Sequence, residues 1–202
     1  MSAVLSALAA VLFAARLGLF ATLHLRPGGI HPVRDTVSDY AASPAPATRR
    51  LAALASWSAA AAWAALGAAV LVLPADGARR PGLGIALLAL ALVLAVLPAV
   101  PTDGPGQSPT LRGRLHLLLA IAWFTLAYST IGPSIDLLRA LGDRVPAPLD
   151  VLHPLAALAL VCLVASLVLT PLRARTFGLS ERAFILAVTL APLVVSAGLA
   201  LG

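Results

Sequence analysis

Six long apolar segments alternate with short polar loops along this chain. A helix needs about 20 apolar residues to cross a hydrocarbon core of roughly 30 Å, and each segment is close to that length. No water satisfies an open backbone inside a bilayer, so helices are the expected element. The pattern predicts an all-α membrane protein, with residues 1–202 forming a single six-helix transmembrane bundle. The expected spans are Ala3–Leu23, Leu51–Leu73, Leu83–Val100, Leu115–Ile131, Val151–Leu172 and Ala183–Leu201.

The composition supports a membrane location. Only 11% of the residues are charged and 60% are hydrophobic, whereas a soluble domain carries roughly 25% charged residues. All fourteen basic residues are arginines, and all except Arg16 lie in the expected loops. That placement suits contact with anionic lipid headgroups. We therefore expect membrane lipids as partners and no nucleic acid, while the sequence leaves protein partners and cofactors unknown.

The distribution of arginine between the loops predicts the orientation. Nine arginines lie in loops one, three and five, and four lie in loops two and four. Positively charged loops stay preferentially in the cytoplasm. We therefore expect a multi-pass protein of the cell membrane with its odd-numbered loops in the cytoplasm.

Loop one carries a concentrated set of polar residues. Pro32 suits the first position of a helix, which predicts a short interfacial helix over Pro32–Ala42. Residues spaced by three and four positions share one face of such a helix. The residues on this face are His31, Arg34, Asp35, Ser38 and Asp39. The alternative interpretation is a solvated face with a surface ion pair between Arg34 and Asp35.

Loop three adds further polar groups on the same side of the membrane. Asp103 lies in a turn rich in proline and glycine, and Arg114 and His116 open the fourth span. Imidazole and carboxylate groups together suit a divalent metal or general acid–base catalysis. The spacing matches no metal-binding motif, so the sequence leaves the metal content unknown. Ordinary turn chemistry for Asp103 and an interfacial position for His116 are the alternatives.

Arg16 is the one charged residue inside an expected span. An isolated arginine at that depth costs about 2.5–3.5 kcal/mol on insertion scales, so it should face the interior and have a partner. We expect an anionic partner: Asp35, Asp39, Asp103 or a phosphate-bearing ligand. Extension of the side chain toward the loop-one face is the alternative.

Three short motifs resemble those of a known family. They are Val37-Ser38-Asp39 in loop one, Pro101-Thr102-Asp103 in loop three, and the Gly113–His116 element opening the fourth span. Together with the span count, they resemble the six-span bacterial and archaeal membrane proteins catalogued as domain of unknown function 998. Ala99-Val100 stands where that family often has an aromatic residue before Pro-Thr-Asp, which is a departure from the pattern. The resemblance implies a shared site and brings no established activity.

These observations favour a polar pocket at one membrane face that binds or processes a lipid headgroup or another amphipathic anion. Whether the protein is an enzyme stays open. A small transporter and a non-catalytic accessory or envelope-stress subunit are the alternatives. The candidate catalytic residues are Ser38, Asp39, Asp103 and His116. The candidate ligand-binding residues are Arg16, His31, Arg34, Asp35 and Arg114.

Overall fold

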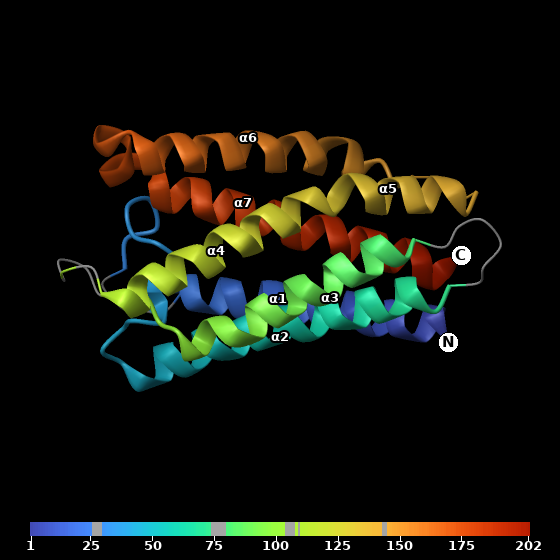
Figure 1. The fold of residues 1–202 in the computed structure, drawn as a ribbon, viewed down its shortest axis with the longest axis horizontal. Helices are drawn as coiled ribbons and strands as arrows, with labels where there is room; N and C mark the ends of the chain where they lie inside the picture. Colours follow the sequence, from blue (N-terminus) through green and yellow to red (C-terminus); the bar gives the residue numbers. More distant parts are fainter. Residues whose placement is uncertain (26–29, 74–79, 104–107, 109, 143–144) are drawn as a thin grey trace.

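The computed structural model describes residues 1–25, 30–73, 80–103, 108, 110–142 and 145–202, which fold into an α-helical bundle (Figure 1). Six of its helical segments are long and apolar enough to cross a membrane. The prediction of an all-α, six-span bundle is confirmed. The elements are α1 (Ser2–Leu25), η1 (Ser38–Tyr40), α2 (Pro46–Leu71), α3 (Pro81–Val96), η2 (Leu97–Ala99), α4 (Leu111–Ser129), α5 (Ile131–Ala140), α6 (Pro148–Val168) and α7 (Thr170–Leu201).

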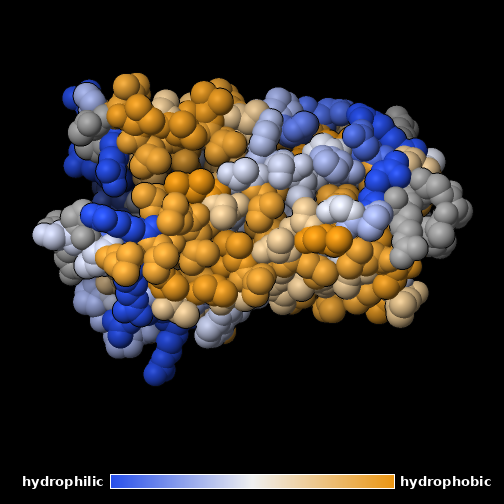
Figure 2. Space-filling view, viewed as in Figure 1, coloured by the Kyte–Doolittle hydropathy of each residue, from blue (hydrophilic) through white to orange (hydrophobic). Residues whose placement is uncertain are grey.

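The outer surface of the bundle is apolar over most of its length. Large aliphatic side chains such as Val11, Leu118 and Val161 are more than half exposed. On the face drawn in Figure 2, hydrophilic side chains gather toward the two ends and apolar ones cover most of the surface between them. A soluble protein rarely exposes a continuous apolar surface of this extent. The surface is therefore suited to contact with lipid chains.

The helices run the length of the bundle, and the loops alternate between its two ends (Figure 1). α1, α2 and α3 pack in sequence, and α7 packs against both α1 and α6. Loop one, loop three and the junction between α6 and α7 lie at one end, while both termini lie at the other. The fold thus brings the two polar loops singled out in the sequence to the same end of the molecule.

The helix in loop one is shorter than the spacing predicted. Only Ser38–Tyr40 form a helix, of three residues, and Pro32–Arg34 form a turn. The reason is local competition: the Asp35 carboxylate accepts the N–H of His31 and the Asp39 carboxylate accepts the N–H of Thr36. Aspartate side chains that bind nearby backbone groups offer the chain an alternative to a continuous helix.

Two other boundaries also differ from the expected ones. The fourth span continues past Gly132 and Pro133 into α5, which ends at Ala140. Pro133 is the third residue of α5, in the first turn, where a missing N–H costs little. α7 begins at Thr170, separated from the end of α6 by Leu169 alone, instead of near Ala183. Residues 180–182 therefore belong to a long helix and not to a loop.

Glycine allows α2 and α3 to approach closely. A Cβ atom on Gly84 would lie 2.6 Å from Leu71 Cγ and 3.2 Å from the carbonyl oxygen of Gly67. In membranes, small residues permit such backbone contact between helices, and van der Waals packing drives their association. The contact lies near the start of α3, at the end of the bundle opposite loop three.

We expect Gly84→Leu to destabilise the bundle. The larger side chain must displace Leu71 and separate the two helices, and overpacking of this kind costs about 1–3 kcal/mol. Thermal unfolding in detergent should show a lower Tm. Gly18→Leu is the matched control, because a Cβ at Gly18 has no atom within 4 Å and this residue is exposed. Equal Tm values for the two variants would contradict the proposed helix contact.

Candidate functional site

Loop one is held against the bundle by two adjacent charged residues of α7. Glu181 and Arg182 are 4% and 7% exposed. The Glu181 carboxylate accepts the N–H of Val37 at 2.7 Å, and Arg182 Nη1 donates to the carbonyl of Asp35 at 2.6 Å. Hydrogen bonds to charged groups are stronger than those between neutral groups. These contacts fix the backbone on both sides of Thr36.

Arg182 also connects loop one with α1. Its Nε donates to His24 Nε2 at 2.6 Å, and its guanidinium carbon lies 5.8 Å from the centre of the Tyr40 ring. His24 Nδ1 lies 2.7 Å from the carbonyl oxygen of Phe20. A carbonyl only accepts, so Nδ1 carries the proton and Nε2 is free to accept from Arg182. The imidazole is therefore neutral in this arrangement.

Loop three is organised by the Asp103 carboxylate. It accepts the hydroxyl of Thr110 at 2.6 Å and the N–H of Thr110 at 2.9 Å. The Thr110 hydroxyl in turn caps α4 by accepting the N–H of Gly113 at 3.1 Å. A Cβ at Gly113 would collide with the Asp103 carboxylate. The side chain hydrogen bond and the backbone hydrogen bond from Thr110 lower the pKa of Asp103 below its ordinary value.

The two loops meet through Ser38 and His116. His116 Nε2 lies 3.0 Å from Ser38 Oγ, and His116 Nδ1 lies 2.6 Å from the carbonyl oxygen of Val100. The imidazole is buried, with 8% of its residue surface exposed. This places two of the candidate catalytic residues, from opposite loops, in direct contact.

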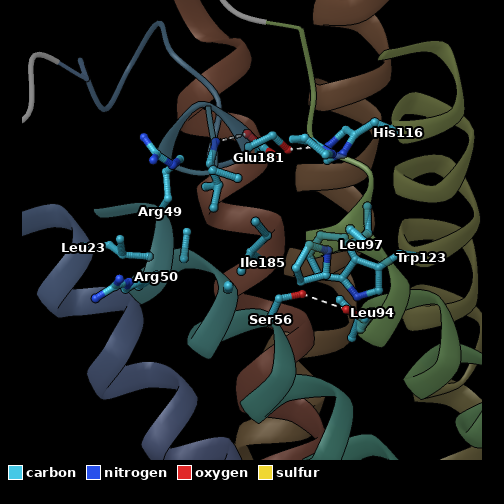
Figure 3. A pocket seen from close by; sticks show the side chains of 18 of the residues that line it. Leu23, Arg49, Arg50, Ser56, Leu94, Leu97, His116, Trp123, Glu181 and Ile185 are labelled. Carbon is cyan, nitrogen blue, oxygen red and sulfur yellow. Dashed lines mark hydrogen bonds between the residues drawn. The ribbon is translucent and has the colours of Figure 1, made fainter. Parts of the chain in front are cut away.

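A cavity of about 470 Å³ lies beneath this contact (Figure 3). Its volume is within the range of about 300–1,000 Å³ typical of small-molecule sites. Most of the wall is apolar, and the polar groups include four arginines. In Figure 3, Arg49 and Arg50 lie across the cavity from His116 and Trp123. The polar lining residues are Arg16, Ser38, Arg49, Arg50, Ser56, Arg112, His116, Trp123 and Glu181.

Two buried donors in the cavity wall have no partner in the part of the chain that the structure describes. Arg16 is 6% exposed, and its only hydrogen-bonding, ionic or cation–π interaction among the described residues is with the Phe20 ring, whose centre lies 5.6 Å from the guanidinium carbon. Trp123 is 8% exposed, and its indole Nε1–H makes no hydrogen bond. A buried donor left without an acceptor costs about 1–3 kcal/mol, and more when it is charged. Both groups are suited to a bound acceptor.

The remaining candidate residues do not line the cavity. Asp39 and Asp103 bind Thr36 and Thr110, as described above, and His31 N–H donates to Asp35. Their chemical roles stay predictions. Arg34 and Arg114 are also outside the lining, and Arg114 is exposed. Among the described residues, no group of three or more His, Cys, Asp or Glu side chains is placed to hold a metal ion.

The comparisons with known proteins agree with the fold. The model of the family described as "Protein of unknown function (DUF998)" matches residues 4–198, nearly the whole chain. The chain belongs to this family. No curated protein and no solved structure matches it. Membership in the DUF998 family thus identifies a membrane protein without assigning a reaction or a ligand.

Several cavity residues were missed by the sequence analysis. Glu181 is the only glutamate in the chain, and the apolar residues Phe177 and Leu179 before it indicated that the last helix begins earlier than Ala183. Arg49, Arg50 and Arg112 were considered only for orientation, and Trp123 was not considered as a site residue. No sequence spacing connects these five residues, because they lie on α2, α4 and α7, and only the fold brings these helices together.

We expect Asp103→Asn to lower the Tm at neutral pH, because the neutral amide binds the start of α4 less strongly than the carboxylate. The pKa of Asp103 is lower in the folded protein than the ordinary Asp value of about 3.9. The ionised carboxylate therefore stabilises the folded state above this value, and the stabilisation is lost as the pH falls through the pKa of the folded state. The Tm difference between wild type and variant should therefore shrink on acidification. Asp136→Asn, which breaks an exposed pair with Arg139, should have little effect. A difference that grows at low pH would contradict this role.

Proposed function

We propose that this DUF998 protein binds an amphipathic anion, a lipid with an anionic headgroup, in the arginine-lined cavity at the loop-one end of the bundle. The observation that carries the proposal is Arg16. Its guanidinium is almost completely buried in a membrane helix, lines the cavity and has no anionic partner among the described residues. Such a cation is costly in a bilayer unless it is paired. An anionic ligand in the cavity supplies the missing partner.

The composition of the cavity wall favours an amphipathic ligand over a small hydrophilic one. Apolar side chains from four helices surround the polar groups, among them Leu23, Ala52, Leu94 and Ile185. Burial of a hydrocarbon chain on such a wall contributes about 25 cal/mol per Å² of apolar surface. Arg49 and Arg112 each donate to backbone carbonyls. Arg50 has no such bond among the described residues, and so is free to bind the headgroup together with Arg16.

Lipid binding by the detergent-solubilised protein tests the proposal. We expect phosphatidylglycerol to be retained through purification, as identified by mass spectrometry, and to bind more tightly than glycerol phosphate, which lacks the chains. Arg16→Gln removes a charged donor worth about 1.5–3 kcal/mol, which corresponds to roughly ten- to a hundredfold weaker binding. Glutamine is easier to insert in a membrane than arginine, so the variant should fold.

The matched control is a pair of arginines on α4. Arg112 and Arg114 lie two residues apart on the same helix and are both exposed, but only Arg112 lines the cavity. Arg112→Gln should weaken phosphatidylglycerol binding and Arg114→Gln should leave it nearly unchanged. Equal effects of the two substitutions, or binding unaffected by Arg16→Gln, would refute the proposed site.

The arginine distribution also supports cytoplasmic placement of the odd-numbered loops. All three arginines assigned to loop five, Arg173, Arg175 and Arg182, belong to α7. Without them, loops one and three as bounded in the sequence still carry six arginines, against four in loops two and four. In a Cys162→Ala background, which removes the single native cysteine, we expect Ser108→Cys to react with a membrane-impermeant maleimide only after cells are permeabilised. Ala140→Cys, at the opposite end of the bundle, should react in intact cells. The reverse pattern would invert the topology.

A further inference from the structure

The hydrogen bonds of His116 determine which of its nitrogens carries the proton. The Val100 carbonyl, 2.6 Å from Nδ1, only accepts, so Nδ1 must donate. In the neutral ring Nε2 is then an acceptor, and it faces Ser38 Oγ at 3.0 Å. The Ser38 hydroxyl therefore donates its proton to a histidine that is oriented by a third group. This is the relation between nucleophile, base and orienting group found in nucleophilic catalysis.

Of the two serines that line the cavity, only Ser38 donates its hydroxyl proton to a histidine. Ser56 lines the same cavity, but its hydroxyl donates to the carbonyl of Leu94 at 2.9 Å. A carbonyl bound in this way does not remove a proton, so Ser56 has no base. Ser38, by contrast, is half-buried and lines the cavity beside a base.

We propose that Ser38 is a nucleophile and His116 its general base, and that together they cleave a carboxylic ester of the anionic lipid held in the cavity. The proposal rests on the proposed function, because the arginines and the apolar wall select the substrate. The orienting group is a neutral carbonyl instead of a carboxylate, so it stabilises an imidazolium less strongly than the aspartate of a Ser-His-Asp triad.

The reaction balances without a further cofactor. Ser38 Oγ attacks the ester carbonyl carbon while its proton passes to His116 Nε2. The tetrahedral intermediate then collapses, the bond from carbon to the alcohol oxygen breaks, and Nε2 returns the proton to the departing alkoxide. Water, activated by the same nitrogen, next attacks the acyl-serine ester, releasing a fatty acid and restoring Ser38.

The cavity also contains donors for the negative charge that develops on the carbonyl oxygen. The Trp123 indole N–H is buried in the wall and has no acceptor among the described residues. Guanidinium groups from α1, α2 and α4 line the same space. Preorganised donors of this kind stabilise the oxyanion in acyl transfer.

Labelling of the full-length protein in mild detergent with a fluorophosphonate probe tests the pair directly. We expect one adduct, which peptide mapping places on Ser38. Ser38→Ala should abolish it, Ser56→Ala should leave it unchanged, and His116→Gln should slow it by about a hundredfold, the contribution typical of a general base. An unlabelled wild-type protein, labelling that survives Ser38→Ala, or a labelling rate that His116→Gln leaves unchanged would overturn the proposal.

A second measurement does not depend on His116→Gln folding correctly. In the Cys162→Ala background, Ser38→Cys should react with iodoacetamide at neutral pH at least about ten times faster than Ser56→Cys, because the neighbouring imidazole removes the thiol proton. Equal rates would show that His116 does not act as a base toward position 38.

The substrate assay separates this proposal from the proposed function. Fatty acid release from mixed vesicles of phosphatidylglycerol and phosphatidylcholine should be seen with wild type and lost in Ser38→Ala, while that variant still binds phosphatidylglycerol. Binding without ester cleavage would retain the lipid site and reject the nucleophile. Probe labelling of Ser38 without phosphatidylglycerol binding or cleavage would reject this lipid as substrate, and with it the proposal as stated.

Discussion

The arrangement of the polar end depends on two adjacent charged residues that α7 carries into the interior, where each of them binds loop one. A charged side chain within a membrane helix costs about 2.5–3.5 kcal/mol on insertion scales, and Glu181 and Arg182 are adjacent and both almost fully buried. Their hydrogen-bond partners include an amide and a carbonyl of loop one. Residues 35–40 of loop one are therefore packed against α7, whereas His31, Pro32 and Arg34 are exposed. Ser38 directly follows Val37, whose N–H donates to Glu181, so its position beside His116 is a consequence of this hydrogen bond.

The polar residues of this end fall into two groups with different consequences. Asp35, Asp39 and Asp103 are occupied by backbone or hydroxyl donors a few residues away, and these contacts shape the loops. Arg16 and Trp123, in contrast, are buried against the cavity with donors that no described atom uses. Because burial of an unsatisfied donor is costly, the second group indicates a ligand, whereas the first accounts for the architecture.

The sequence was sufficient to predict the spans, because hydrophobic length is nearly the only requirement for crossing a bilayer. It was also sufficient to predict that loops one and three lie at the same end, since consecutive spans alternate direction. It could not predict the limits of the loop-one helix, where Asp35 and Asp39 bind the backbone locally. Nor could it place Glu181, because the charges at 181 and 182 resemble the end of a span until their internal partners are known. Ser38 and His116 were identified as candidates, but their contact joins residues 78 positions apart.

The hydrogen bond between Ser38 and His116 could serve only to join loops one and three. In that role it would add little, because other contacts already hold both loops. Glu181 holds the adjacent residue of loop one, and Asp103 with Thr110 fixes the start of α4. The Val100 carbonyl has a different effect, since it selects the tautomer of His116 and leaves Nε2 as an acceptor. The groups that line the cavity are consistent with a role for His116 Nε2 as a base. In the proposed substrate, a glycerophospholipid, the ester carbonyls are only a few bonds from the phosphate. A cavity of about 470 Å³ lined by arginines and by a histidine nitrogen beside a serine hydroxyl offers groups suited to both parts of that short segment.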